Sequence, residues 1–214
     1  MMKIEERRSF AGDVEIRMID GARVAVGYAA KFGTRSADLG GFVEQIAPTA
    51  FTKTVMEADV RALRDHDPSR LLGRTGAGTL RLLIDAVGLR YEIDLPDTQE
   101  GRDTALLLER GDLFGSSFGF RTISDSWAQT ETGFPLRTLT EVALRDVGPV
   151  TFPAYAATEA ALRSLAGHAG CPFDEVVEAA GRNELRHLLS TPVRSDEAAV
   201  EAPLTVIRRN WRAR

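Results

Sequence analysis

A histidine, two adjacent serines and an aspartate are spaced along the chain in a way that could support nucleophilic catalysis. His66 is followed about fifty residues later by Ser116 and Ser117, and then by Asp146. A serine hydroxyl is a weak nucleophile until a neighbouring base takes its proton, and histidine suits that task because its pKa lies near neutrality. A carboxylate can orient the histidine. The chain order is therefore histidine, serine, aspartate.

His66 is the histidine that we expect at such a site. Of the three histidines, His168 falls in a predicted linker and His187 in a predicted helix near the C-terminus, whereas His66 ends a strand-like run. Asp65 and Asp67 adjoin it in sequence, but in an extended strand their side chains point away from it. An ordinary histidine with a local hydrogen bond remains an alternative.

The parity of strand residues favours Ser117 over Ser116. Side chains alternate across a strand, so Ser116 shares a face with Phe118 and Phe120, which belong in a core. Ser117 then points to the opposite face, together with Gly119, which leaves room for a substrate backbone. The alternative is that both serines only allow close packing of strands.

Asp146 is the predicted partner of the histidine. It has the same parity as Val142, Leu144 and Val150, so we expect its carboxylate among apolar neighbours. A buried carboxylate without a partner is costly, and an imidazole N–H would satisfy it. A salt bridge to an arginine is the alternative, and Glu141 is the second candidate for the acid.

The composition limits the classes of function. The chain has 214 residues, of which 43% are hydrophobic and 27% charged, which is ordinary for a globular protein. A net charge of −4 gives no reason to expect direct binding of nucleic acid. The single cysteine excludes an internal disulfide, and no histidine and carboxylate cluster has metal-ligand spacing. We expect no cofactor, no metal, no signal peptide and no membrane span.

The elements that must position these residues indicate a strand-rich fold. Short alternating runs predict many strands, and helices are expected to begin near Pro48 and Asp97. The fold class is therefore α+β: a mainly antiparallel, barrel-like β-sheet with a few surrounding helices.

The predicted domain organisation has three parts. Residues 1–12 are expected to be a flexible N-terminus and residues 13–165 the catalytic domain. Residues 166–214 are expected to be a C-terminal tail, with a linker at 167–170, one helix over 173–189, and a flexible polar end.

Five pieces of sequence resemble the prohead serine proteases of tailed phages, which are distant fold relatives of the herpesvirus assemblins. The resemblance covers about residues 25 to 165. Its pieces, in order, are Gly27–Ala30 with Phe32, Phe42–Phe51, His66-Asp67 with Leu72-Gly73, Gly111–Leu113 leading into Ser117–Phe120, and Asp146–Tyr155.

The resemblance implies an assemblin-like fold and a role for each site residue. His66 would be the base, Ser117 the nucleophile, and Asp146 the third member, where the family usually has glutamate. The implied activity is that of a serine endopeptidase in viral head maturation. It would cleave scaffold or the scaffold-like segment of the major capsid protein, and also itself.

The resemblance also implies where and with what the protein acts. It would work inside the assembling prohead, in the host cytoplasm. A homodimer or higher oligomer is expected by analogy with the assemblins. The tail would serve encapsulation or be removed by a cut between Leu165 and Gly170.

Three other readings compete with a protease. The same fold could act as a non-catalytic scaffold or shell-binding protein, or the chain could be a purely structural β-rich domain. The sequence of residues 115–119 also matches the Gly-x-Ser-x-Gly motif of the nucleophile elbow in small-ester hydrolases. That elbow leads into a helix, whereas Phe120–Ile123 predicts a continuing strand.

Overall fold

The structure is a computed structural model that describes residues 5–12, 14–152 and 159–189, and its strands form two sheets. The first sheet has the order β1-β9-β10-β5-β6, and β4 also pairs with β10. The second has the order β2-β3-β8-β7. Strands of the first sheet are β1 Glu6–Ala11, β4 Val43–Ile46, β5 Arg61–Leu63, β6 Leu71–Arg74, β9 Gly115–Gln129 and β10 Pro135–Val150. Those of the second are β2 Glu15–Ile19, β3 Ala22–Lys31, β7 Leu80–Ile84 and β8 Gly88–Asp94.

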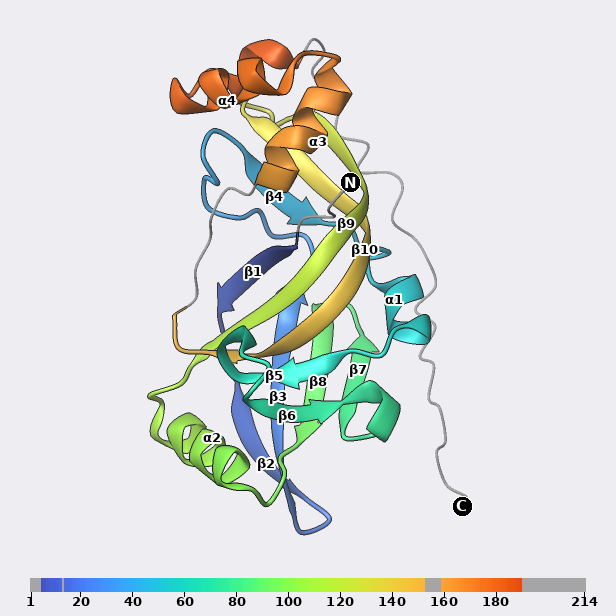
Figure 1. Cartoon of the computed structure of the whole chain (residues 1–214), viewed down its shortest axis with the longest axis vertical. Coiled ribbons are helices and arrows are strands. Elements are labelled where there is room, and N and C mark those ends of the chain that lie inside the picture. Colours follow the sequence, from blue (N-terminus) through green and yellow to red (C-terminus); the bar gives the residue numbers. More distant parts are fainter. Residues whose placement is uncertain (1–4, 13, 153–158, 190–214) are drawn as a thin grey trace.

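The predicted α+β class is confirmed, but the predicted barrel is not found. Most strand pairs are antiparallel, and β10 pairs in parallel with β4 and β5. In the described part of the chain, the outermost strands of each sheet do not pair with one another, so neither sheet closes on itself. Figure 1 shows β9 and β10 as a long twisted pair that runs from α3, at one end of the molecule, to β5 near its middle.

The main core lies between the two sheets and buries the inner faces of both. Phe51, Phe118 and Phe120 are fully buried there, and the rings of Phe118 and Phe120 stack with centroids 4.8 Å apart. Aromatic side chains bury large apolar areas, so these residues fix β9 against the core. The opposite face of β9 is thereby left for polar side chains.

Two helices flank this core near the positions that the sequence predicts. They are α1 Thr52–Glu57 and α2 Gln99–Arg110. The cap of α2 is Thr98, one residue after the predicted Asp97, and its hydroxyl accepts a hydrogen bond from the Gly101 backbone N–H at 3.2 Å. Gly111 ends the helix with a left-handed φ of 77°, a conformation that glycine adopts readily.

The C-terminal part of the described chain differs from the prediction. The expected linker at 167–170 falls largely within α3 Glu159–Ala169, and the expected helix over 173–189 is shorter, α4 Phe173–Gly181 followed by the 3₁₀ turn η3 Leu185–Leu188. These elements form a second apolar cluster. The cluster includes Leu39, Phe42, Trp127, Leu165, Val176 and Leu185.

This packing gives residues 159–189 a structural role, because the apolar faces of α3 and α4 cover the end of β9 that carries Trp127. The predicted flexible end of the tail, residues 190–214, lies outside the described residues. None of the helices in the described ranges is long and apolar enough to cross a membrane.

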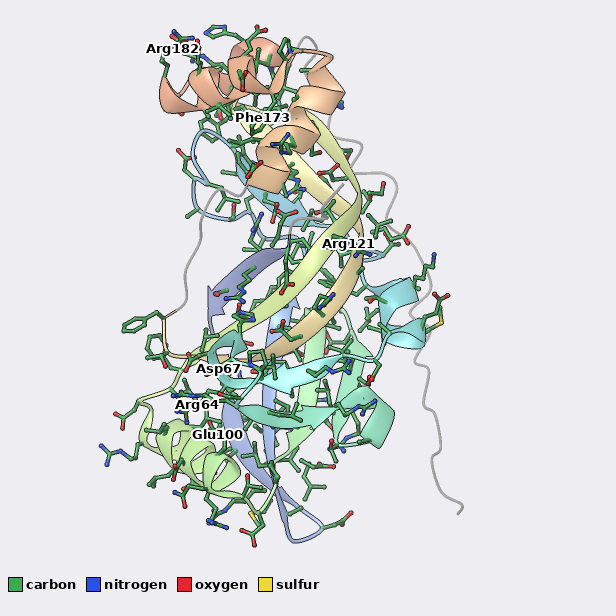
Figure 2. The ribbon with its side chains drawn as sticks, in the orientation of Figure 1. Arg64, Asp67, Glu100, Arg121, Phe173 and Arg182 are labelled. Atoms are coloured by element: carbon green, nitrogen blue, oxygen red, sulfur yellow. The ribbon has the colours of Figure 1, made fainter. Side chains whose placement is uncertain are left out.

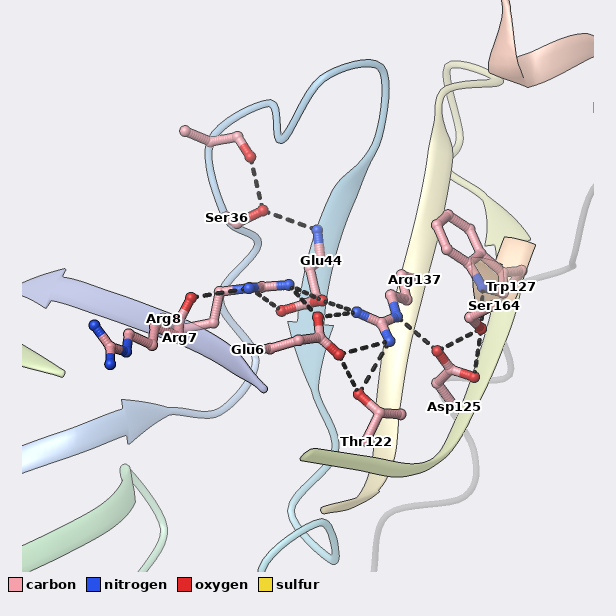
Figure 3. A network of polar contacts seen from close by, with 11 residues as sticks. Glu6, Arg7, Arg8, Ser36, Glu44, Thr122, Asp125, Trp127, Arg137 and Ser164 are labelled. Carbon is pink, nitrogen blue, oxygen red and sulfur yellow. Dashed lines mark hydrogen bonds and ion pairs between the residues drawn. The ribbon is translucent and has the colours of Figure 1, made fainter. Parts of the chain in front are cut away.

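The N-terminal segment also differs from the prediction of flexibility. Strand β1 pairs antiparallel with β9 and carries two buried charged side chains, Glu6 and Arg8. They join Glu44 of β4 and Arg137 of β10 in a buried ion-pair cluster, seen in Figure 3. Burial would raise the pKa of Glu6, but hydrogen bonds and ion pairs with Arg137 and Arg8 lower it to about 2.

We predict that Arg137→Met lowers the free energy of unfolding by about 3–5 kcal/mol, because the substitution leaves buried carboxylates without the positive charge of Arg137 that neutralises them. Urea unfolding measures this change. Arg17→Met is the control, since Arg17 is half exposed and forms an ion pair only with Glu15 in the part of the chain that the structure describes. A loss for Arg137→Met of no more than about 1 kcal/mol, as for a surface ion pair, would contradict the prediction.

Candidate active site

The two serines of β9 point to opposite faces of the strand, as parity predicts. Ser116 lies on the core face, where its hydroxyl donates a hydrogen bond to the Tyr91 hydroxyl at 3.1 Å. Burial raises the pKa of Tyr91, which keeps that phenol neutral. Ser117 lies on the other face. Because β9 continues as a strand to Gln129, the helix that a small-ester hydrolase elbow requires is not present.

His66 follows a strand but does not belong to it. Strand β5 ends at Leu63, and Arg64–His66 form a 3₁₀ turn in which Asp65 and His66 have positive φ angles of 55° and 57°. The Asp65 carboxylate accepts a hydrogen bond from the Thr151 backbone N–H at 2.6 Å. The turn is therefore tied to the end of β10, and this link holds the histidine over the sheet.

A bulge in β10 determines to which face of the sheet the Asp146 side chain points. The register of β10 against β9 shifts between Leu144 and Asp146, which leaves Arg145 as an extra residue. Leu144 is opposite Phe120 on the core face, whereas Asp146 is opposite Gly119 on the face of the site. The prediction that Asp146 shares a face with Leu144 is therefore wrong.

The structure brings the three predicted site residues together. His66 Nε2 lies 2.6 Å from Ser117 Oγ, and His66 Nδ1 is bonded to Asp146 Oδ1. All three side chains are buried. With the carboxylate on Nδ1, the imidazole carries its proton on that nitrogen and presents the lone pair of Nε2 to the serine hydroxyl.

Gly119 is needed for this arrangement, and sequence reasoning gave it only the role of making room for substrate. A Cβ atom at residue 119 would overlap Asp146 Oδ2, so a side chain there displaces the carboxylate. The pairing of Asp146 with Gly119 depends on the bulge, and the sequence alone gave no signal of it.

The other candidate acids do not reach the histidine. Glu141 lies 3.6 Å from Lys53, and Asp67 accepts a hydrogen bond from the Ser69 backbone N–H at 2.8 Å. Arg64, the arginine of the turn that carries His66, lies 3.1 Å from the Glu100 carboxylate of α2. Figure 2 shows Arg64 and Glu100 side by side, beside the turn that carries His66.

Strand β1 adds contacts that the sequence did not suggest. Ser9 is opposite Ser117 in the β1–β9 pairing, and its hydroxyl lies 2.9 Å from Ser117 Oγ. The backbone carbonyl oxygen of Arg8 lies 2.8 Å from the same atom. Among the described residues, no group of histidine, cysteine and carboxylate side chains could hold a metal ion.

Comparison with known proteins places the chain in a family. Residues 12–169, more than half of the chain, match the model of the caudovirus prohead serine proteases. The chain belongs to this family. The prohead protease chain is also similar to a solved structure, the bacteriophage T4 capsid assembly protease gp21, with 14% identity over 70% of this chain and 98% of that chain and a TM-score of 0.44. No curated protein matches the sequence.

We predict that Gly119→Ala lowers any proteolytic activity of this site by about 10²-fold, because the added methyl group moves Asp146 away from His66. Cleavage of the major capsid protein from the same genome, co-expressed with each variant, measures the activity. Gly167→Ala in α3 is the control, since a Cβ there meets no atom within 4 Å. Equal activity of the two variants would contradict the inferred contact.

Proposed function

We propose that the chain is a prohead serine endopeptidase that cleaves peptide bonds during head maturation. The observation that carries this proposal is the position of His66 between Ser117 and Asp146, in a chain that belongs to the prohead serine protease family. Its substrates are the scaffold, or the scaffold-like segment of the major capsid protein, and the protease itself.

Ser117 is the proposed nucleophile and His66 the general base. The Ser117 oxygen attacks the carbonyl carbon of the substrate while its proton passes to His66 Nε2, which lies 2.6 Å away. The peptide bond then breaks, and His66 returns the proton to the leaving amine. A water molecule hydrolyses the resulting ester by the same sequence of proton transfers.

Asp146 is the proposed orienting residue. Its carboxylate holds the proton on Nδ1 of His66 and stabilises the imidazolium that forms during attack. The aspartate is shorter than the glutamate expected in the family. The bulge and the glycine opposite it compensate, because they let the carboxylate approach His66 from the neighbouring strand.

The proposed place of action is the interior of the assembling prohead in the host cell, where a homodimer or higher oligomer is the expected form. The proposed self-cleavage between Leu165 and Gly170 meets a structural constraint. Residues up to Ala169 belong to α3, and Leu165 is fully buried. Proteases bind substrates in extended form, so a cut there requires α3 to unwind.

We predict that Ser117→Ala abolishes cleavage of the co-expressed major capsid protein, because loss of a serine nucleophile costs on the order of 10⁶ in kcat. Ser116→Ala is the matched control, since Ser116 bonds to Tyr91 on the opposite face of the same strand, and it should leave cleavage intact. Intact masses of both proteins provide the measurement.

The same experiment separates the protease from its main alternative, a non-catalytic scaffold protein of the same fold. If the unaltered chain and Ser117→Ala both leave the capsid protein and the chain itself uncut while shells assemble, the scaffold function holds instead. If Ser116→Ala alone stops cleavage, the nucleophile has been assigned to the wrong serine.

A further inference from the structure

The nucleophile is closed off from solvent by the chain's own N-terminal strand. Ser117 has 0% exposure, although an endopeptidase must reach the backbone of another polypeptide. The backbone carbonyl of Arg8 and the hydroxyl of Ser9 lie directly against its oxygen. Something must therefore move before a substrate can reach Ser117, and β1 is an edge strand whose residues contact its hydroxyl directly.

The contact with β1 also competes for the proton that catalysis needs. Ser117 has one hydroxyl proton, and two acceptors lie within hydrogen-bond distance: His66 Nε2 at 2.6 Å and the Arg8 carbonyl oxygen at 2.8 Å. Whenever the proton is donated to the carbonyl, the base cannot take it. In addition, the Ser117 hydroxyl donates its hydrogen bond to the oxygen of the Arg8 carbonyl group, whereas nucleophilic attack is directed at the carbonyl carbon. In this arrangement β1 acts as an inhibitor and not as a substrate under attack.

The side chain of Arg8 is bound in the way that a recognition pocket binds arginine. Its guanidinium donates to both carboxylate oxygens of Glu44, at 2.7 and 2.9 Å, and is buried (Figure 3). It also lies 5.6 Å from the centre of the Phe120 ring. This paired geometry matches the planar fork of arginine, which lysine cannot reproduce. By contrast, Arg7 is exposed, and its side chain points away from the cluster (Figure 3).

Strand β1 is placed so that it can leave without unravelling the rest of the fold. Among the described strands it is an edge strand of its sheet and pairs with β9 alone. When Glu6 and Arg8 depart with it, Arg137 still pairs with Glu44 at 2.9 Å and with Asp125 at 2.6 Å. The strand also lies before residues 12–169, which match the family.

We propose that β1 is a built-in substrate mimic, and that a substrate peptide with arginine at the position of Arg8 takes its place along the edge of β9. This inference rests on the proposed protease function and deepens it. The peptide adds to the sheet as a strand, a common mode of peptide recognition. Glu44 binds the arginine, the next residue is small like Ser9, and the bond between them is the one cleaved.

Displacement of β1 is tested with Arg8→Glu, which places a third carboxylate beside Glu6 and Glu44 and drives the strand out. Arg7→Glu is the matched control, with the same change of charge on the exposed side of the same strand. We expect a fluorophosphonate probe to label Ser117 roughly tenfold faster or more in Arg8→Glu than in Arg7→Glu, because the open population increases. Arg8→Ala, which adds no charge, should change the rate in the same direction and serves if Arg8→Glu fails to fold.

The binding of a substrate strand is tested without catalysis, by adding Ser117→Ala to each variant. A fluorescein-labelled peptide with the sequence of residues 5–12 should bind the Arg8→Glu chain, as measured by fluorescence anisotropy, and should not bind the Arg7→Glu chain, whose own β1 is in place. A peptide with glutamate at the position of Arg8 should bind neither chain.

The outcomes separate this inference from the proposed function. Equal labelling of the Arg8 and Arg7 variants, together with no peptide binding, overturns the inference even if capsid protein is cleaved. Peptide binding without any labelling of Ser117 supports strand recognition and overturns the protease function. If Arg8→Glu instead forms dimers on size exclusion and binds no peptide, the edge of β9 takes a second copy of this chain and not a substrate.

Discussion

The geometry of the candidate site depends on one extra residue in β10. Without the bulge at Arg145, the alternation of side chains would keep Asp146 on the same face as Leu144, in the core between the sheets. The bulge turns the carboxylate to the face that carries Ser117, opposite a glycine that has no side chain to block it. A buried carboxylate also needs a partner, and His66 meets that need.

The sequence was sufficient for the parts of the structure that follow from local alternation. The parity of Phe118 and Phe120 was enough to place Ser117 away from the core, and local sequence was enough to predict helices near Pro48 and Asp97. It also led to Asp146, whose carboxylate is bonded to His66 Nδ1, but the predicted face of the strand was wrong, because a strand without a bulge was assumed. A register shift is set by pairing with a distant strand, so no pattern within 144–150 reveals it.

Pairing between residues far apart in the sequence explains the other differences from prediction. Residues 6–11 are rich in charge, which ordinarily indicates a solvent-exposed end of the chain. Here Glu6 and Arg8 are neutralised by Arg137 and Glu44, which come from strands far along the sequence. Similarly, the barrel was inferred from the many short strands and the short connections between elements, whereas the division into two sheets depends on which strands pair.

The proposed control of activity depends on β9, the strand that also carries the proposed nucleophile, Ser117. One edge of β9 bonds to β10, which brings Asp146, and the other edge pairs with β1. Any peptide that pairs with this second edge passes directly beside Ser117, so the surface that binds substrate is also the surface that an internal strand can block. In the mechanism proposed above, β1 provides this control, because displacing the strand exposes the Ser117 hydroxyl and frees the arginine site in one step.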